Sequence, residues 1–149
     1  MHLTQHTDYA FRMLIHAALR APRMTTVREV AVDFGLSAAH LNKVAQTLAA
    51  HGYLETVRGR AGGLRLIREP VSIRLGEVAK ATEPDFHLVP CMAPDGNCPI
   101  YDPCLLRNLL FEAGEVFLTE LNKWTLADLV KRPQPLLVAI ASSRGHIPV

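Results

Sequence analysis

Residues 26–66 read TVREVAVDFGLSAAHLNKVAQTLAAHGYLETVRGRAGGLRL, and this stretch decides the fold. Thr26 and Glu29 have the spacing of a capping box ahead of a short apolar stripe, and Gly35 follows where that helix would end. Ser37 is placed to cap a second helix, which would end at the glycine of AAHG. Two short helices joined by a glycine-containing turn are typical of a helix-turn-helix, whose second helix enters the DNA major groove.

The sequence after this second helix changes to a β-type pattern. The runs YLETV (53–57) and LRLI (64–67) flank RGRAGG (58–63), a loop with three glycines and two arginines. A β-hairpin that directly follows a helix-turn-helix predicts a winged helix.

The flanking segments predict further helices. Thr7 is placed to cap a helix over DYAFRMLIHAALR, in which apolar residues recur every three to four positions. From Leu105 a long apolar stripe predicts a dimerisation helix, and the capped turn TLADLV follows Trp124. We therefore expect a mainly α fold with a small β-hairpin wing, in which a winged helix-turn-helix is joined to a long dimerisation helix.

The length and composition fit one globular domain, and the chain is too short to hold a full catalytic domain in addition. Of the 149 residues, 49% are hydrophobic and 20% are charged, which supports a packed core and argues against disorder. Residues 1–75 hold ten Lys or Arg and five Asp or Glu, whereas residues 76–149 hold six and nine, so the two halves are expected to face different partners. No apolar run approaches the roughly 20 residues that span a bilayer, and the N-terminus does not resemble a signal peptide. We expect a cytoplasmic protein with no membrane partner.

The candidate DNA contacts lie at the start of the second helix and in the hairpin loop. Side chains near the start of a recognition helix read base edges, and an asparagine there can pair with adenine. Arginines flanked by glycines can approach phosphates or the minor groove closely. The alternatives are the solvated face of a surface helix and an ordinary hairpin turn. The predicted DNA-binding residues are Ser37, Ala39, His40, Asn42 and Lys43 in the helix, and Arg58, Arg60 and Gly62 in the loop.

The three cysteines, Cys91, Cys98 and Cys104, lie in a loop that also holds five prolines between residues 84 and 104. An odd, clustered count is a poor disulfide framework, and the spacing C-x6-C-x5-C lacks the close pair of a structural zinc site. Widely spaced thiolates can wrap an iron–sulfur cluster. Two alternatives are three free thiols and a cysteine nucleophile paired with His87, although no orienting group lies nearby and the sequence offers no substrate pocket. We therefore expect a protein that is not an enzyme.

Several segments together resemble the iron–sulfur winged-helix repressors, a family with NsrR-like, IscR-like and RirA-like branches. The resemblance is carried by MHLTQHTDYAFRML, by AAHLNKVAQTLAAHGYLETVRGRAGGLRL, by the three-cysteine loop and by FLTELNKWTLADLV. It implies a homodimer with a cluster on Cys91, Cys98 and Cys104, of the 4Fe-4S rather than the 2Fe-2S type, and binding to double-stranded DNA that depends on the state of the cluster. A two-fold dimer implies a near-palindromic operator.

Two positions relate the chain to the branches of this family. Arg107 stands where the IscR-like branch carries a histidine ligand, whereas Asp8 matches the aspartate with which NsrR-like members complete the cluster of the partner subunit. Without the resemblance, Asp8 would be a carboxylate that offsets the dipole of the first helix. The remaining alternative ligands are His2, His6 and His87.

The resemblance therefore predicts a nitric oxide-sensing repressor. The alternatives are an iron- or redox-responsive repressor with the same site and, from another class, a redox or electron-transfer protein. The expected division is a winged-helix DNA-binding domain (1–83), a cysteine-rich cluster-binding loop (84–104) and a dimerisation helix with a C-terminal tail (105–149).

Overall fold

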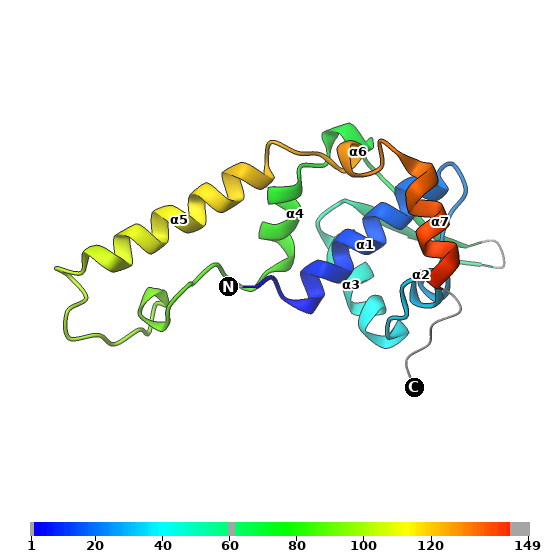
Figure 1. Cartoon of the computed structure of the whole chain (residues 1–149). Helices are drawn as coiled ribbons and strands as arrows, with labels where there is room; N and C mark the ends of the chain where they lie inside the picture. Colours follow the sequence, from blue (N-terminus) through cyan, green and yellow to red (C-terminus); the bar gives the residue numbers. More distant parts are fainter. Residues whose placement is uncertain (1, 60–61, 144–149) are drawn as a thin grey trace.

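A computed structural model describes residues 2–59 and 62–143. Within these residues, most of the chain is helical and one antiparallel hairpin is present, which confirms the expected fold class (Figure 1). No helix in the described residues is both long enough and apolar enough to cross a membrane. The elements are α1 (Gln5–Arg20), α2 (Val27–Phe34), α3 (Ala38–Ala50), β1 (Leu54–Val57), β2 (Gly63–Leu66), η1 (Pro70–Ser72), α4 (Leu75–Thr82), η2 (Pro90–Met92), α5 (Leu105–Leu121), α6 (Leu126–Leu129) and α7 (Pro133–Ser143).

The helix-turn-helix consists of α2 and α3, and their ends lie where the sequence predicts. The Thr26 side chain accepts the backbone N–H of Glu29, and the Glu29 carboxylate accepts the backbone N–H of Thr26 at 2.7 Å, which completes the capping box. Gly35 ends α2 with a φ of +64°, in the left-handed region that glycine enters without steric cost. Ser37 caps α3 through the backbone N–H of His40.

The hairpin is tied to the chain that enters α2. Strands β1 and β2 pair in antiparallel register from Leu54 opposite Leu66 to Val57 opposite Gly63. The backbone of Leu64 also exchanges hydrogen bonds of 2.6 and 3.0 Å with Thr25, just before the helix-turn-helix. The wing and the helix-turn-helix are therefore held in a fixed relation by backbone contacts.

The core lies where α1 packs against α3 and α4. The largest fully buried side chains come from all parts of the body and include Met13, Leu14, Val30, Leu41, Leu48, Leu54, Ile73, Val78 and Leu126. Each buried aliphatic side chain of this size contributes about 1.5–3 kcal/mol relative to an exposed one. This shared core holds the helix-turn-helix on α1.

The start of α1 differs from the sequence prediction. The N-cap is Thr4, whose hydroxyl accepts the backbone N–H of Thr7, so the helix begins three residues earlier than predicted. Thr7 is fully buried and its hydroxyl lies 2.9 Å from that of Thr82 in α4. Thr4 is held in the capping position because Glu83 accepts hydrogen bonds from both its backbone N–H and its hydroxyl.

A buried polar cluster joins α1 to α2. His16 Nε2 lies 2.9 Å from a carboxylate oxygen of Asp33, and His16 Nδ1 lies 2.7 Å from the hydroxyl of Thr25. A carboxylate only accepts hydrogen bonds, so the neutral imidazole donates from Nε2 and accepts the Thr25 hydroxyl at Nδ1. Burial lowers the pKa of His16, although the Asp33 contact acts in the opposite direction.

Helix α5 forms an arm that projects from the body, and the cysteine-rich loop runs beneath it from the body to the far end, where α5 begins (Figure 1). Only Gly114 and Leu118 of this helix are buried. Two leucines of the predicted apolar stripe, Leu106 and Leu109, are at least half exposed, and so are two further apolar residues of the helix, Leu105 and Val116.

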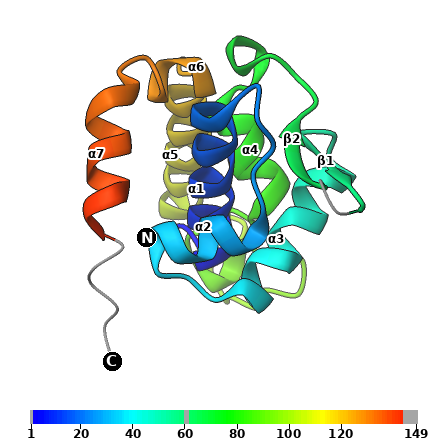
Figure 2. The same cartoon turned by 90° about the vertical axis from the view of Figure 1, so that its right-hand side faces the viewer.

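The segment after the arm returns to the body. Thr125 and Asp128 form a capping box at the start of α6, as predicted, and Leu126 is fully buried. Helix α7 then lies beside α2, on the side of the body opposite to the hairpin (Figure 2). Ile140 is buried there, and the hydroxyl of Ser143 donates to the backbone carbonyl of Asp33 at 2.8 Å.

Candidate DNA interface and metal centre

Helix α3 presents its predicted base-reading residues on one exposed face. Ser37, Ala39, Asn42 and Lys43 are exposed, whereas Leu41 of the same helix is fully buried in the core. The apolar side of α3 thus anchors the helix and leaves the polar side available to a DNA groove.

His40 is placed differently from its neighbours, because it faces α1 as well as solvent. Its ring lies 4.7 Å from that of Tyr9 and 5.9 Å from that of His6, measured between ring centroids. Burial lowers the pKa of His6, with a further lowering from nearby His40, and His6 Nε2 lies 3.1 Å from the hydroxyl of Thr47. The start of the recognition helix is therefore packed against the start of α1.

The wing presents Arg58 to solvent at the end of β1. Gly59 has a φ of +114°, which disfavours other residues. A side chain at Gly62 would collide with the carbonyl oxygen of Val57, so this glycine keeps the loop tight. Arg60 lies outside the described residues.

Two further arginines, Arg65 on the hairpin and Arg68 just after it, are not among the predicted DNA contacts. Arg65, on β2, pairs with Glu55 across the strands. Arg68 lies 5.0 Å above the ring of Tyr53 and donates to the backbone carbonyl of His51. The period-two alternation of β2, which turns Arg65 to the side opposite buried Leu64, is the sequence signal that could have identified an exposed cation there.

The three cysteines are free and half-buried. Cys91 lies in η2, and Cys104 is the N-cap of α5, where its Sγ accepts the backbone N–H of Arg107 at 3.4 Å. In the part of the chain that the structure describes, no three His, Cys, Asp or Glu side chains lie close enough to hold one metal ion. The structure places the thiols on one loop without bringing them into a single ligand set.

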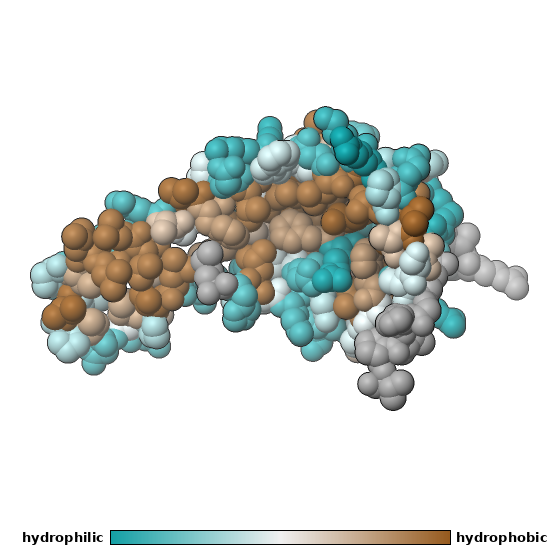
Figure 3. Space-filling model, viewed as in Figure 1, coloured by the Kyte–Doolittle hydropathy of each residue, from teal (hydrophilic) through white to brown (hydrophobic). Residues whose placement is uncertain are grey.

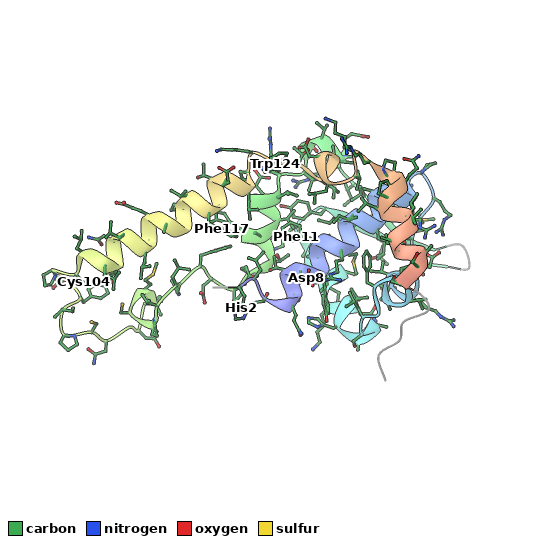
Figure 4. The ribbon with its side chains drawn as sticks, viewed as in Figure 1. His2, Asp8, Phe11, Cys104, Phe117 and Trp124 are labelled. Atoms are coloured by element: carbon green, nitrogen blue, oxygen red, sulfur yellow. The ribbon has the colours of Figure 1, made fainter. Side chains whose placement is uncertain are left out.

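Asp8 lies on the body, far from the cysteine-bearing end of the arm (Figure 4). Arg12 Nε contacts both oxygens of its carboxylate, at 2.9 and 3.1 Å. The Arg12 guanidinium also lies 5.8 Å from the centroid of the Phe34 ring in α2. Asp8 and Cys104 therefore cannot share a ligand site within one chain of this shape.

The alternative histidine ligands fall into two places. His6 faces α3, as described above, whereas His2 and His87 line the same pocket of about 720 Å³ between the N-terminal residues, residues 83–88 and α5. His87 Nδ1 lies 3.6 Å from a carboxylate oxygen of Asp85.

The fold is that of a winged-helix DNA-binding protein, because an exposed recognition helix is followed directly by a β-hairpin. The loop that carries the thiols is separate from this unit. Residues 3–132 match the Rrf2 family model, described as "Iron-dependent Transcriptional regulator". The chain belongs to the Rrf2 family.

The relatives are transcription regulators. The chain is 41% identical over 147 residues to the HTH-type transcriptional regulator NsrR of Geobacillus kaustophilus, covering 97% of this chain and 100% of the relative. It is 41% identical over 139 residues to the HTH-type transcriptional regulator NsrR of Bacillus subtilis, covering 92% and 95%. The structure of CymR, the global cysteine regulator of B. subtilis, matches with a TM-score of 0.69 at 22% identity over 88% of this chain and 97% of that one, which supports the same fold. The protein is thus a DNA-binding transcriptional regulator of the Rrf2 and NsrR type and not an enzyme.

Proposed function

We propose that this protein is a homodimeric repressor whose DNA binding responds to nitric oxide through an iron–sulfur cluster. In this proposal Cys91, Cys98 and Cys104 of one subunit and the partner's Asp8 hold the cluster, which is of the 4Fe-4S type. The observation that carries the proposal is the separation of Asp8, on the body, from Cys104, at the far end of the arm (Figure 4), in a chain whose three thiols are all free. Two copies that pair through their arms, with the tip of each arm at the body of the other copy, would bring the thiols of one subunit to Asp8 of the other.

The donor set fits an iron–sulfur cluster. The three thiols are uncommitted and occur on a stretch in which the described backbone has only turns and one short 3-10 helix, so the loop can adjust around a group larger than one ion. Cys104 is the N-cap of a 17-residue helix, and its Sγ accepts the backbone N–H of Arg107, so the end of α5 already presents a donor to this sulfur. When bound, such a cluster supplies iron with which nitric oxide reacts.

Exposed apolar side chains on the arm, α5, support the proposal of a dimer. Leu105, Leu109 and Val116 are 69%, 51% and 66% exposed. Apolar side chains gather at the far end of the arm and continue as a band towards the body (Figure 3). Continuous apolar patches of this kind are typical of interaction surfaces, and an isologous contact between two arms would give the two-fold symmetry of a near-palindromic operator.

Asp8 has two alternative partners in this proposal. It pairs with Arg12 in the chain described here and would exchange this contact for iron on the partner's loop. Arg12 also contacts Phe34 in the helix-turn-helix. A change in the partner of Asp8 would therefore free Arg12 and alter its contact with the DNA-binding helices. A carboxylate is a weaker ligand for iron than a thiolate, which makes Asp8 the ligand that a small molecule displaces first.

The DNA contacts in this proposal are those of a winged helix. The exposed face of α3 reads bases, and Arg58, Arg60 and Gly62 bring the wing to phosphates or the minor groove. We retain the division into a DNA-binding domain (1–83), a cluster-binding loop (84–104) and a dimerisation helix with its tail (105–149) as part of the proposal.

The test is anaerobic purification with assay of iron and sulfide, an absorption spectrum, and titration with nitric oxide while binding to an operator fragment is followed. We expect loss of DNA binding as nitric oxide is added, and loss of iron and sulfide in Cys98→Ala. If DNA binding instead follows iron removal or oxidation and ignores nitric oxide, the protein is the iron- or redox-responsive alternative, a reading that the description of the family model favours. If Cys98→Ala retains full iron and sulfide, the cluster assignment is wrong.

A further inference from the structure

Arg107 and Arg20 carry the only buried side-chain nitrogens without a hydrogen-bond partner in the described residues, in each case Nε. Leaving a buried donor without a partner is unfavourable, and more so when the group is charged, so such an atom requires an explanation. Arg20 belongs to the buried cluster of His16 and Asp33, where one of its two terminal nitrogens, Nη2, donates to Asp33 at 3.1 Å. Arg107 lies elsewhere, in the first turn of α5 beside the cysteine-rich loop.

The side chain of Arg107 is held in one direction by the loop itself. Its terminal nitrogen donates to the hydroxyl of Tyr101 at 2.8 Å, and the guanidinium lies 4.0 Å above the ring of the same tyrosine. Its backbone N–H donates to Sγ of Cys104. Tyr101 falls between Cys98 and Cys104 in the chain, so the orientation of Arg107 depends on the segment that carries the cysteines.

Residues near both ends of the cysteine-rich loop line a pocket beside Arg107. A pocket of about 240 Å³ is lined by His87, Met92, Arg107, Asn108 and Phe111. Met92 directly follows Cys91, and Arg107 is three residues beyond Cys104. None of the ion pairs among the described residues includes Arg107, and no carboxylate lines the pocket. The guanidinium therefore brings an uncompensated positive charge and a free donor to the place where the ends of the loop meet.

We propose that Arg107 is a positioning residue that tunes the metal site: its Nε–H donates to a thiolate or sulfide sulfur, and its charge offsets the negative charge of the thiolate ligands. This inference rests on the proposed function. Hydrogen bonds to sulfur and nearby charge set the reduction potential of an iron–sulfur cluster. A fixed cation stabilises the more negative, reduced state, so Arg107 raises the reduction potential.

The test compares Arg107→Gln, which removes the charge, with Arg107→Lys, which keeps the charge but lacks Nε and the planar group that stacks on Tyr101. The matched control is Arg132→Gln, an exposed arginine between α6 and α7. Iron and sulfide per chain and the reduction potential are measured on anaerobically purified protein, and far-UV circular dichroism checks the fold. We expect a lower potential in Arg107→Gln, an intermediate value in Arg107→Lys and the parental value in the control.

A second variant covers the case in which Arg107→Gln retains no cluster. Tyr101→Phe removes the hydroxyl that holds the guanidinium but keeps its charge, and it should lower the potential by a smaller amount. Parental potentials in both Arg107→Gln and Tyr101→Phe would overturn the inference and leave Arg107 as a packing residue, even if the thermal stability of the cluster-free protein fell. Absence of iron and sulfide from the parent protein would overturn the proposed function itself, and the two failures are therefore distinct.

Discussion

Arg12 Nε lies 2.9 and 3.1 Å from the two carboxylate oxygens of Asp8, so this carboxylate is already paired within its own chain. Both side chains are partly exposed, and pairs of this kind contribute about 0.2–1 kcal/mol. The pairing is therefore weak enough to be exchanged. A carboxylate that pairs weakly with arginine and is also a weaker ligand for iron than a thiolate suits a reversible contact between subunits.

The first prediction concerns Asp8→Ala. The three thiols remain, so we expect a cluster that still assembles, with an altered absorption spectrum because one iron changes its ligand. The link to the partner's body is lost, and the dependence of operator binding on nitric oxide should weaken. An unchanged spectrum together with an unchanged nitric oxide response would return Asp8 to the role of a helix-start carboxylate.

The second prediction concerns Arg12→Ala, which removes the competing partner of Asp8. Asp8 should then stay on iron more firmly, and the nitric oxide concentration needed for half-release of the operator should rise. Because the lost pair contributes at most about 1 kcal/mol, the rise should be no more than about fivefold. Arg23→Ala is the control, since Arg23 forms a similar exposed pair with Glu29 away from this site. A lower rather than a higher nitric oxide requirement would contradict the exchange.

The third prediction separates the wing from the recognition helix. Arg58→Ala should weaken binding to all DNA sequences alike and reduce the salt slope by about 1, as expected for the loss of a phosphate contact. Asn42→Ala should cost about 1–3 kcal/mol, mainly at the cognate operator. Fluorescence anisotropy at several salt concentrations, with cognate and scrambled duplexes, measures both. If both variants lose affinity in the same sequence-independent way, Asn42 does not read bases.

The parts of the fold that could be predicted from sequence are those set by short-range backbone chemistry. The capping box of Thr26 and Glu29 and the cap at Ser37 each need partners only three residues away, so the pattern is complete in the local sequence. The cap of α1 could not be chosen in this way. Thr4 and Thr7 are both suitable capping residues, and the choice depends on Glu83 and Thr82, which are far away in the sequence.

The candidate site was predictable only in its donors. Cysteine count and spacing indicate a metal, and the exposed side of α3 follows from its apolar stripe. Two contacts could not be predicted. Arg107 stacks on Tyr101 because of the path of the loop, and His40 packs against Tyr9 because of how α3 crosses α1, and the spacing of apolar residues in the sequence predicts neither arrangement. The surface that covers the apolar stripe of α5 could not be predicted either, because the sequence of one chain shows only that the stripe is apolar.

The fourth prediction uses the pH dependence of stability. Burial lowers the pKa of His16 below its ordinary value of 6.5, so the unfolded chain binds more protons than the folded one as the pH falls through this value. The contribution of His16 to stability is therefore complete above about pH 6.5 and is lost at lower pH. We expect the free energy of unfolding of the parent to fall more steeply between about pH 7 and pH 5 than that of His16→Gln.

The same variant should also be less stable than the parent at neutral pH. Altering a buried partner of Asp33 and Thr25 should cost about 1–3 kcal/mol. Urea unfolding followed by circular dichroism gives both quantities. His51→Gln, which changes an exposed histidine, is the control and should leave the pH profile as in the parent. Equal pH slopes in the parent and His16→Gln would show that other groups carry the acid sensitivity.

The fifth prediction tests the arm as the dimer contact. Leu109 is 51% exposed on α5, and burying a leucine side chain in an interface contributes about 1.5–3 kcal/mol. Leu109→Glu replaces this gain with the cost of desolvating a charge in each subunit, so the dissociation constant of the dimer should rise at least about tenfold. Val71→Glu places the same charge at a residue that is 66% exposed on η1, outside the arm, and should leave the dimer intact. Sedimentation velocity over a concentration series measures both variants, and equal dissociation constants for them would show that the arm is not the contact between subunits.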